Sequence, residues 1–279
     1  QTMNVDGSET KTLNVELKKE DKSLSEVVVQ ASNEVPDGWQ QYGDFFLEHF
    51  IGKTPNASMT VLENPEVLKF YFLKKSNKLR VLATDPLKIT NNALGYTMQY
   101  DLDSFVYYYN TNINSYRGNC LYTLMEGTEE QQSEWEAKRE KAYYGSRLHF
   151  LRAYYDSTLA RDGFTVDILS AVIRNKFDRL ANPYDANYYY ADSLNDDVEL
   201  WFPKKVSITY YKSPPEQEYL SQMLLPQDVQ YQISYVDLRD AIIIKPNGYF
   251  IDQRNWVNEG YWSWKNIADQ LPFDYEPYR

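Results

Sequence analysis

The chain contains very little cysteine and histidine: one cysteine, Cys120, and two histidines among 279 residues. A single cysteine cannot form an internal disulfide and supplies no thiolate cluster for zinc. Because Cys120 lies in the alternating stretch 119–122, we expect it to act as a small buried hydrophobic residue. The sequence therefore predicts no metal site and no cofactor, and the cysteine does not reveal the redox compartment.

Basic charge and long apolar runs are also lacking. The formal net charge is −11, whereas a non-specific nucleic-acid binder needs a basic surface to displace counterions. An anionic membrane surface repels a chain of this charge. No apolar run approaches the roughly 20 residues of a membrane-spanning helix. We therefore expect no nucleic-acid partner and no direct membrane span.

Sequence motifs for catalysis are absent as well. There is no GxSxG nucleophile elbow, no HxxxH or HExxH pair and no glycine-rich phosphate loop. His49 and His149 lie in predicted helices, and we interpret both as structural histidines hydrogen-bonded near a helix–sheet interface. The alternative is a hydrolase that uses His149, because Asp156 lies two helical turns further along the same face.

Aromatic residues are abundant instead, with 26 Tyr, 12 Phe and 6 Trp. Tyrosine combines a large ring with a polar tip, so it suits half-buried sheet faces and interfaces. The spread of the tyrosines along the chain favours packing in a β-rich core. Two local groups also fit a contact with sugar or protein, and they give the candidate binding residues Tyr184, Tyr188, Tyr189, Tyr190, Trp262 and Trp264.

The first of these groups lies in a predicted polar loop at 182–197 that is rich in oxygen ligands, including Asp185, Asp192 and Asp197. Calcium prefers such ligands, but the loop lacks the DxDxDG spacing of an EF-hand. We interpret the segment as a solvated acidic loop.

Near the N-terminus, apolar and polar residues alternate at 12–17 and again at 24–29, the period of half-buried strands. Two strands alone are marginally stable in water, so we expect them to complete a sheet that begins elsewhere in a longer chain. Pro36-Asp37-Gly38 then breaks the pattern. The predicted domains are residues 1–34, the end of a domain whose sheet begins elsewhere, and residues 35–279, a body domain.

The body is predicted to be α+β with a largely antiparallel sheet. An amphipathic helix spans 39–51 and ends at Gly52. Short strands separated by turn residues then predict an antiparallel meander, at 67–73, 79–83, 87–90, 96–102, 105–109 and 119–125.

Two helices are predicted to follow this meander. Thr128 and Gln131 form a capping box for a helix that ends near residue 142. A second helix begins near residue 146 and ends at 163. Because the two are joined at Gly145, we expect them to pack as a helical hairpin.

The C-terminal third is predicted to be β-structure again. Strands are expected at 206–211, 229–236 and 241–244. The turn residues at 245–248 predict a hairpin with 249–251. Trp262, Trp264 and Ile267 indicate a short closing helix.

Several short motifs of the body resemble a large Bacteroidota family whose members are called carboxypeptidase-like regulatory domain-containing proteins. The motifs are FLEHFIG at 46–52, NA at 56–57, NPEVL at 64–68, DPL at 85–87, NNALGY at 91–96, Arg139, AYYGS at 142–146, HFLRA at 149–153 and LPFDYEP at 271–277. Each is short, so their specificity lies in the combination. LSEVVV at 24–29 similarly resembles the last strand of the transthyretin-like β-sandwich that precedes the body in this family.

The resemblance implies export to the periplasm or outer membrane, and it carries no catalytic residue onto this chain. DST at 156–158 and DSL at 192–194 also resemble the O-glycosylation acceptor motif of that phylum. We therefore predict a non-catalytic cell-envelope binding or scaffold protein. It would be an accessory subunit of an outer-membrane complex for transport, secretion or barrel assembly, with an outer-membrane or periplasmic protein as its partner. The alternative is a glycan-binding module at the cell envelope.

Overall fold

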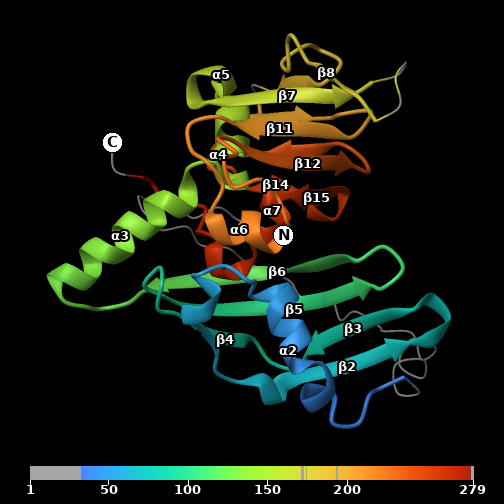
Figure 1. The fold of residues 1–279 in the computed structure, drawn as a ribbon, viewed down its shortest axis with the longest axis vertical. Coiled ribbons are helices and arrows are strands. Elements are labelled where there is room, and N and C mark those ends of the chain that lie inside the picture. The colour runs from blue at the N-terminus through green and yellow to red at the C-terminus, as the bar shows by residue number, and fades with distance from the viewer. Residues whose placement is uncertain (1–32, 171–172, 174, 193, 278–279) are drawn as a thin grey trace.

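The computed structural model describes residues 33–277 except 171, 172, 174 and 193. These residues form an α+β fold with three sheets in which every described strand pair is antiparallel, so the predicted fold class is confirmed (Figure 1). The strands predicted at 12–17 and 24–29 lie outside the described residues, and so does almost all of the predicted domain 1–34.

The first sheet has the order β1-β4-β5-β3-β2, and β6 pairs with β5. Its strands are β1 Thr60–Leu62, β2 Leu68–Leu73, β3 Lys78–Ala83, β4 Leu87–Asn91, β5 Tyr96–Tyr108 and β6 Ile113–Leu124. The simple meander predicted from sequence is incorrect here, because β5 is one strand rather than two. Strand β6 pairs with one edge of β5. The opposite edge of β5 is shared by β4, which pairs with 96–100, and β3, which pairs with 105–108.

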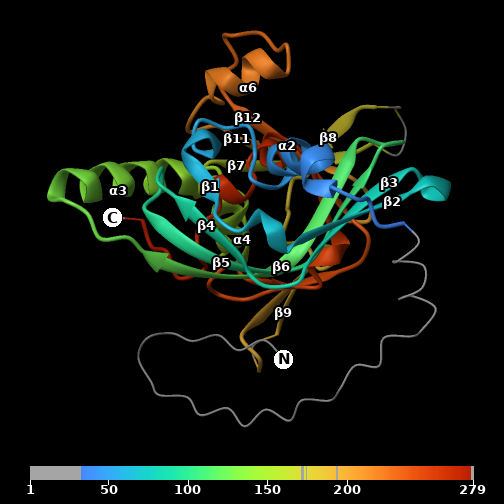
Figure 2. The same ribbon diagram turned by 90° about the horizontal axis from the view of Figure 1, so that it is seen from below.

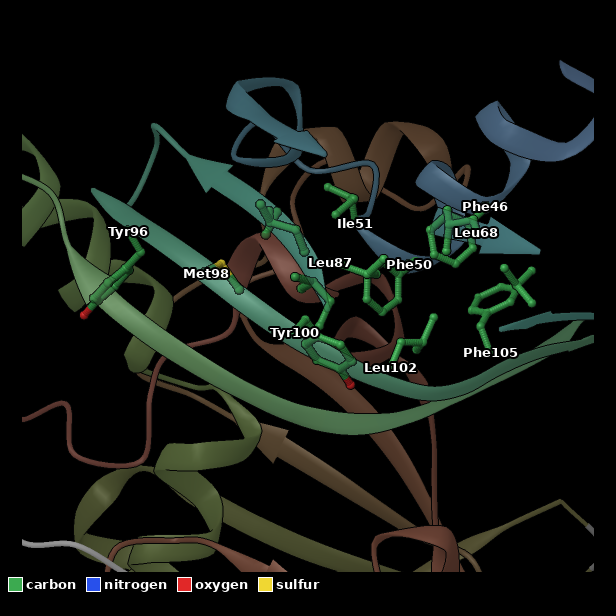
Figure 3. Close-up of a cluster of buried hydrophobic side chains, with 14 of the residues drawn as sticks. Phe46, Phe50, Ile51, Leu68, Leu87, Tyr96, Met98, Tyr100, Leu102 and Phe105 are labelled. Carbon is green, nitrogen blue, oxygen red and sulfur yellow. The ribbon is translucent and has the colours of Figure 1, made fainter. Parts of the chain in front are cut away.

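The core of the first half lies between this sheet and α2, Gly38–Phe50, as predicted from its apolar spacing. Phe46 and Phe50 on α2 are fully buried, and their rings lie 5.2 Å from those of Phe105 and Tyr100 respectively (Figure 3). In the first half of β5, buried and exposed side chains alternate, so one face of the strand belongs to the core.

Helix α3, Glu129–Tyr143, begins with the predicted capping box of Thr128 and Gln131. Helix α4, Arg147–Tyr155, begins at Ser146, whose hydroxyl accepts the N–H of His149. The predicted second helix is shorter than expected. It is interrupted at Ser157, where φ is 57°, and the separate helix α5, Leu159–Asp162, follows.

Helices α3 and α4 are joined at Gly145, but they diverge there instead of packing as the predicted hairpin (Figure 1). Helix α3 packs against the first half, where the indole of Trp135 donates to the carbonyl of Asn92, in the turn between β4 and β5, at 2.9 Å. Most buried residues of α4, among them Phe150 and Tyr154, lie in the second core. The helices diverge because their apolar side chains are buried in different cores.

The second half contains two sheets with the orders β15-β12-β11-β7-β8 and β14-β13-β10-β9. Their strands are β7 Phe164–Leu169, β8 Phe177–Arg179, β9 Tyr189–Asp192, β10 Asp197–Leu200, β11 Val206–Tyr210, β12 Gln232–Leu238, β13 Ile242–Ile244, β14 Phe250–Ile251 and β15 Trp256–Gly260. The predicted hairpin between β13 and β14 is confirmed. The predicted loop at 182–197 is partly wrong, because β9 lies inside it and pairs with β10.

Short helices complete the described part of the chain. They are α6 Gln217–Gln222, α7 Tyr261–Trp264 and the 3-10 turns η1 Ala57–Met59, η2 Pro65–Val67, η3 Lys74–Ser76, η4 Gln253–Asn255 and η5 Ile267–Asp269. The predicted closing helix therefore exists as α7 followed by η5. No helix in the described residues is both long and apolar enough to cross a membrane.

The segment after α7 returns from the second half to the first sheet. Figure 1 shows the second half above the first sheet, and Figure 2 views the first sheet from below with the second half behind it. The N–H of Ala268 donates to Ile51 at 3.1 Å, and Asn91 donates to the carbonyl of Ala268 at 2.9 Å. Arg152 on α4 donates to the carbonyls of Phe273 and Tyr275 at 3.0 and 2.8 Å. These contacts tie the two halves together through the C-terminal segment.

Candidate functional site

The tyrosines predicted as a binding surface around 184–190 are mostly packed inward. Tyr184, Tyr188 and Tyr189 are half-buried against the second core, and the hydroxyl of Tyr184 accepts the N–H of Leu159 at 2.9 Å. Strand alternation in β9 turns Tyr190 outward, and its side chain is 64% exposed. Of these four residues, Tyr190 is the one that the structure offers to a large ligand.

Trp262 and Trp264 are also core residues, 6% and 4% exposed. The Trp262 indole donates to the carbonyl of Gly145 at 2.7 Å, and the Trp264 indole donates to Gln222 at 2.8 Å. Their polar tips are satisfied inside the protein, so these two residues do not form the exposed aromatic surface that the sequence predicts. The six candidate residues thus do not form one site.

The acidic segment at 185–197 uses its carboxylates to close turns. Asp185 accepts the N–H of Asn187 at 3.0 Å, and Asp192 accepts the N–H of Leu194 at 3.0 Å. Across the residues that the structure describes, no group of three or more His, Cys, Asp or Glu side chains is placed to hold a metal ion.

His149 lies deep among aromatic rings and does not contact Asp156. Its Nδ1 accepts the N–H of Gly145 at 3.1 Å, and the rings of Tyr143 and Phe164 both lie 4.9 Å away. Burial lowers the pKa of His149 from 6.5 to about 4. The ring is therefore neutral at pH 7, which fits the structural role proposed from sequence. His49 bonds the carbonyl of Phe45 through Nδ1 at 2.9 Å.

A large cleft of about 1810 Å³ lies between the two halves of the molecule. Its walls are β6, the junction of α3 and α4, the segment from β14 to α7 and the C-terminal residues 269–276. Drug-sized ligands occupy roughly 300–1,000 Å³, so this cleft has room for a longer, extended ligand.

Strand β6 lines this cleft along its whole length, from Ile113 to Leu124. It pairs with β5 on one edge, and no strand within the described ranges pairs with the other edge. Twelve residues at about 3.4 Å each give an open edge about 40 Å long. Such an edge presents unpaired backbone N–H and C=O groups to an extended chain.

Tyrosines of β5 and β6 also line the cleft, together with Cys120. Burial raises the pKa of Tyr116 to about 12 and that of the Cys120 thiol to about 12. Burial likewise holds the pKa of Tyr100 above its ordinary value. At neutral pH these groups are uncharged O–H and S–H donors, and the thiol is not a nucleophile. Cys120 is half-buried rather than fully buried.

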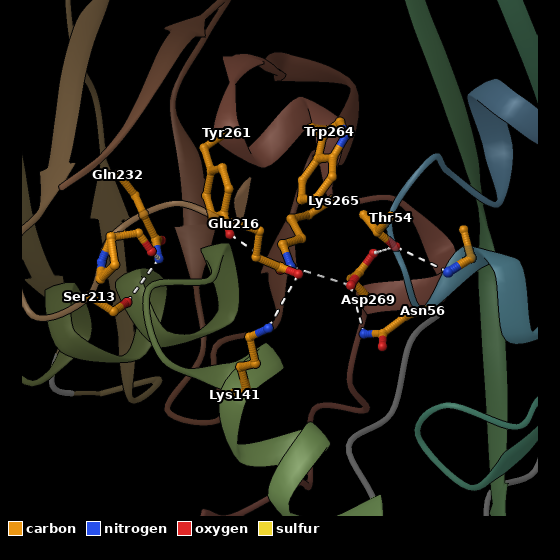
Figure 4. A network of polar contacts seen from close by, with 12 residues as sticks. Thr54, Asn56, Lys141, Ser213, Glu216, Gln232, Tyr261, Trp264, Lys265 and Asp269 are labelled. Atoms are coloured by element: carbon orange, nitrogen blue, oxygen red, sulfur yellow. Dashed lines mark hydrogen bonds and ion pairs between the residues drawn. The ribbon is translucent and has the colours of Figure 1, made fainter. Parts of the chain in front are cut away.

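A network of charged side chains, drawn in Figure 4, also lines the cleft. Lys265 on the segment after α7 contacts Glu216 and Asp269, the latter at 3.4 Å. Burial opposes the charge of Lys265, but the nearby carboxylates of Asp269 and Glu216 outweigh it and hold the pKa of Lys265 above its usual value. Lys265 is therefore a permanent cation at neutral pH and cannot act as a general base.

Comparison with known proteins gives no relative from which a function could be transferred. No protein-family model matches the chain, and no curated protein or solved structure shows significant similarity to it. The resemblance to the Bacteroidota family therefore stays a prediction from the short motifs.

Proposed function

We propose that this chain is a non-catalytic binding or scaffold protein of the cell envelope, an accessory subunit of an outer-membrane complex, which binds an extended segment of its partner along β6. The open edge of β6 in the cleft is the observation that carries this proposal. The envelope setting comes from the sequence motifs alone.

The geometry supports strand addition because the unpaired edge of β6, the volume of the cleft and exposed apolar side chains of β6 occur in the same place. An added strand gains affinity from main-chain hydrogen bonds and specificity from pockets for alternate side chains. On β6, Leu121 and Leu124 are each 62% exposed and line the cleft. An incoming segment would cover both side chains and satisfy the backbone groups of β6.

The state of the acid–base residues supports the non-catalytic half of the proposal. His149 is neutral and its Nδ1 accepts a backbone N–H, while Lys265 is held between carboxylates. The Cys120 thiol is protonated because burial raises its pKa. Each of these side chains has a structural role that explains its position.

Co-purification from detergent-solubilised outer membranes tests the proposal with two matched variants. Leu121→Lys places a charge on the edge strand, where lysine disfavours strand addition. Tyr190→Lys places the same charge on the exposed β9 surface. We expect the first variant to lose at least 90% of the partner and the second to retain it.

Hydrogen–deuterium exchange on the purified complex locates the contact. Binding along β6 should slow amide exchange within 113–124 and leave β9 unchanged. The proposal is refuted if the chain is recovered only as a free monomer, or if Tyr190→Lys rather than Leu121→Lys releases the partner. A glycan array with the same two variants tests the glycan-binding alternative, which now depends on Tyr190.

A further inference from the structure

Arg147, the first residue of α4, lines the cleft and has no counterion among the described residues. Its guanidinium lies over the Phe250 ring, with Cζ 5.4 Å from the ring centre. It makes no ion pair and no hydrogen bond to any described residue, and its side chain is half-buried. Burial lowers the pKa of Arg147, but arginine stays cationic in proteins. Burying an unpaired charge opposes folding, so its retention calls for a reason.

The side chains with the largest electrostatic effect on this cation are tyrosines, not carboxylates. Three tyrosines that line the cleft act on the pKa of Arg147, namely Tyr100, Tyr116 and Tyr122. Tyr116 accepts a hydrogen bond from Gln270 at 2.9 Å, whereas the Tyr100 hydroxyl has no hydrogen-bond partner among the described residues. A neutral hydroxyl next to a guanidinium adds a donor for an anion and brings no competing negative charge.

Trp256 supplies a second, independent observation. Its side chain is 7% exposed and lines the same cleft, yet its indole N–H has no acceptor in the described part of the protein. The Trp256 ring lies 5.6 Å from that of Phe250, so both Trp256 and Arg147 flank one ring. A buried donor without an acceptor is costly, and a ligand oxygen would remove that cost.

We propose that Arg147, together with the Trp256 indole N–H and the Tyr100 hydroxyl, forms an anchor for a carboxylate of the bound segment. The planar guanidinium matches the two oxygens of a carboxylate, and the neighbouring donors satisfy its remaining lone pairs. This inference builds on the proposed function, because it names the chemistry by which the cleft recognises its partner. The carboxylate belongs either to an acidic side chain or to the C-terminus of the segment.

Acetate titration of the isolated chain, followed by NMR, tests the anchor without the partner. The reporters are the Trp256 indole N–H, assigned with Trp256→Phe, and the Arg147 Nε–H. We expect saturable shifts with millimolar acetate and none with acetamide, its neutral analogue. Arg147→Gln should weaken acetate at least tenfold, and Arg147→Lys should weaken it less, because lysine keeps the charge but lacks the planar fork.

Equal shifts with acetamide, or unchanged acetate affinity in Arg147→Gln, would overturn the anchor. If Arg147→Gln does not fold, Arg147→Lys, followed at the Trp256 indole N–H, and Trp256→Phe, followed at the Arg147 Nε–H, decide the same question. With the partner segment in hand, an amidated C-terminus and Glu→Gln or Asp→Asn changes identify which carboxylate binds. If the isolated chain binds acetate but co-purification recovers no partner, the proposed function is refuted and the anchor is not. If a partner binds equally well to the Arg147 variants, the anchor is refuted and the proposed function is not.

Discussion

Replacing Lys265 by methionine isolates the contribution of its charge. Methionine keeps an unbranched apolar stem between the rings of Tyr261 and Trp264, over which the ammonium lies at 5.5 and 5.2 Å. The side chains of Lys265 and its partners Glu216 and Asp269 are 19%, 12% and 1% exposed. The substitution therefore leaves two buried carboxylates without the cation they share.

The expected cost follows from what each carboxylate retains. Glu216 keeps Lys141 at 3.3 Å, and Asp269 keeps hydrogen bonds from Thr54 and Asn56 at 2.7 and 2.9 Å. Breaking a buried pair costs about 3–5 kcal/mol, and these remaining partners place Lys265→Met near the lower end, about 3 kcal/mol. Urea unfolding followed by circular dichroism measures this difference.

The pH dependence of this loss has a defined sign. Burial already raises the pKa of Asp269 above its ordinary value, and removing Lys265 raises it further. The folded variant then takes up a proton more readily than the unfolded chain, so its stability falls as pH rises towards the folded pKa. The deficit of Lys265→Met should therefore be larger at pH 8 than at pH 5, and adding Asp269→Asn should recover part of it. A loss below about 1 kcal/mol, as for a surface pair, or a loss indifferent to pH and to Asp269→Asn, would refute this reasoning.

Two further substitutions test the packing around the site. Because burial lowers the pKa of His149 from 6.5 to about 4, the unfolded chain binds the extra proton in this range, and stability falls as pH drops from 6.5 to 4. The wild type should lose about 3 kcal/mol more than His149→Gln over that interval, and parallel pH profiles in urea unfolding would contradict the assignment. Gly118→Ala should destabilise the β5–β6 pair by about 1–3 kcal/mol, because the added Cβ would lie 2.2 Å from the carbonyl oxygen of Asp101. Asn119→Ala, at an exposed neighbour, is the control, and equal melting temperatures for the two variants would argue against this register.

Local signals in the sequence predicted those elements whose causes are local. The capping box of Thr128 and Gln131, the helix ending near Gly52 and the hairpin after β13 are each specified within a few residues, and all three occur. The predicted pairing of strands was less successful. β5 shares one edge between β3 and β4, and no local pattern encodes that arrangement, since it depends on contacts between distant segments.

The candidate site shows the same limit more sharply. Tyr190 and Trp262 carry the same amphipathic chemistry in sequence, yet Tyr190 is 64% exposed and Trp262 only 6%. Strand alternation turns Tyr190 outward, and a hydrogen bond to Gly145, 117 residues away, fixes Trp262 in the core. Composition identifies aromatic residues that suit an interface, but the tertiary fold decides which of them reach one.

Arg147 could not have been found from sequence, because what distinguishes it is that no carboxylate among the described residues pairs with it. The chain has 40 acidic and 29 basic residues, so a buried cation has many carboxylates available to it. Arg139 pairs with Glu136 at 2.6 Å, and Lys265 contacts two carboxylates. Arg147 instead faces tyrosines, which cannot neutralise it. In so acidic a protein, a cleft that surrounds its cation with neutral donors preserves the charge for an anion supplied from outside.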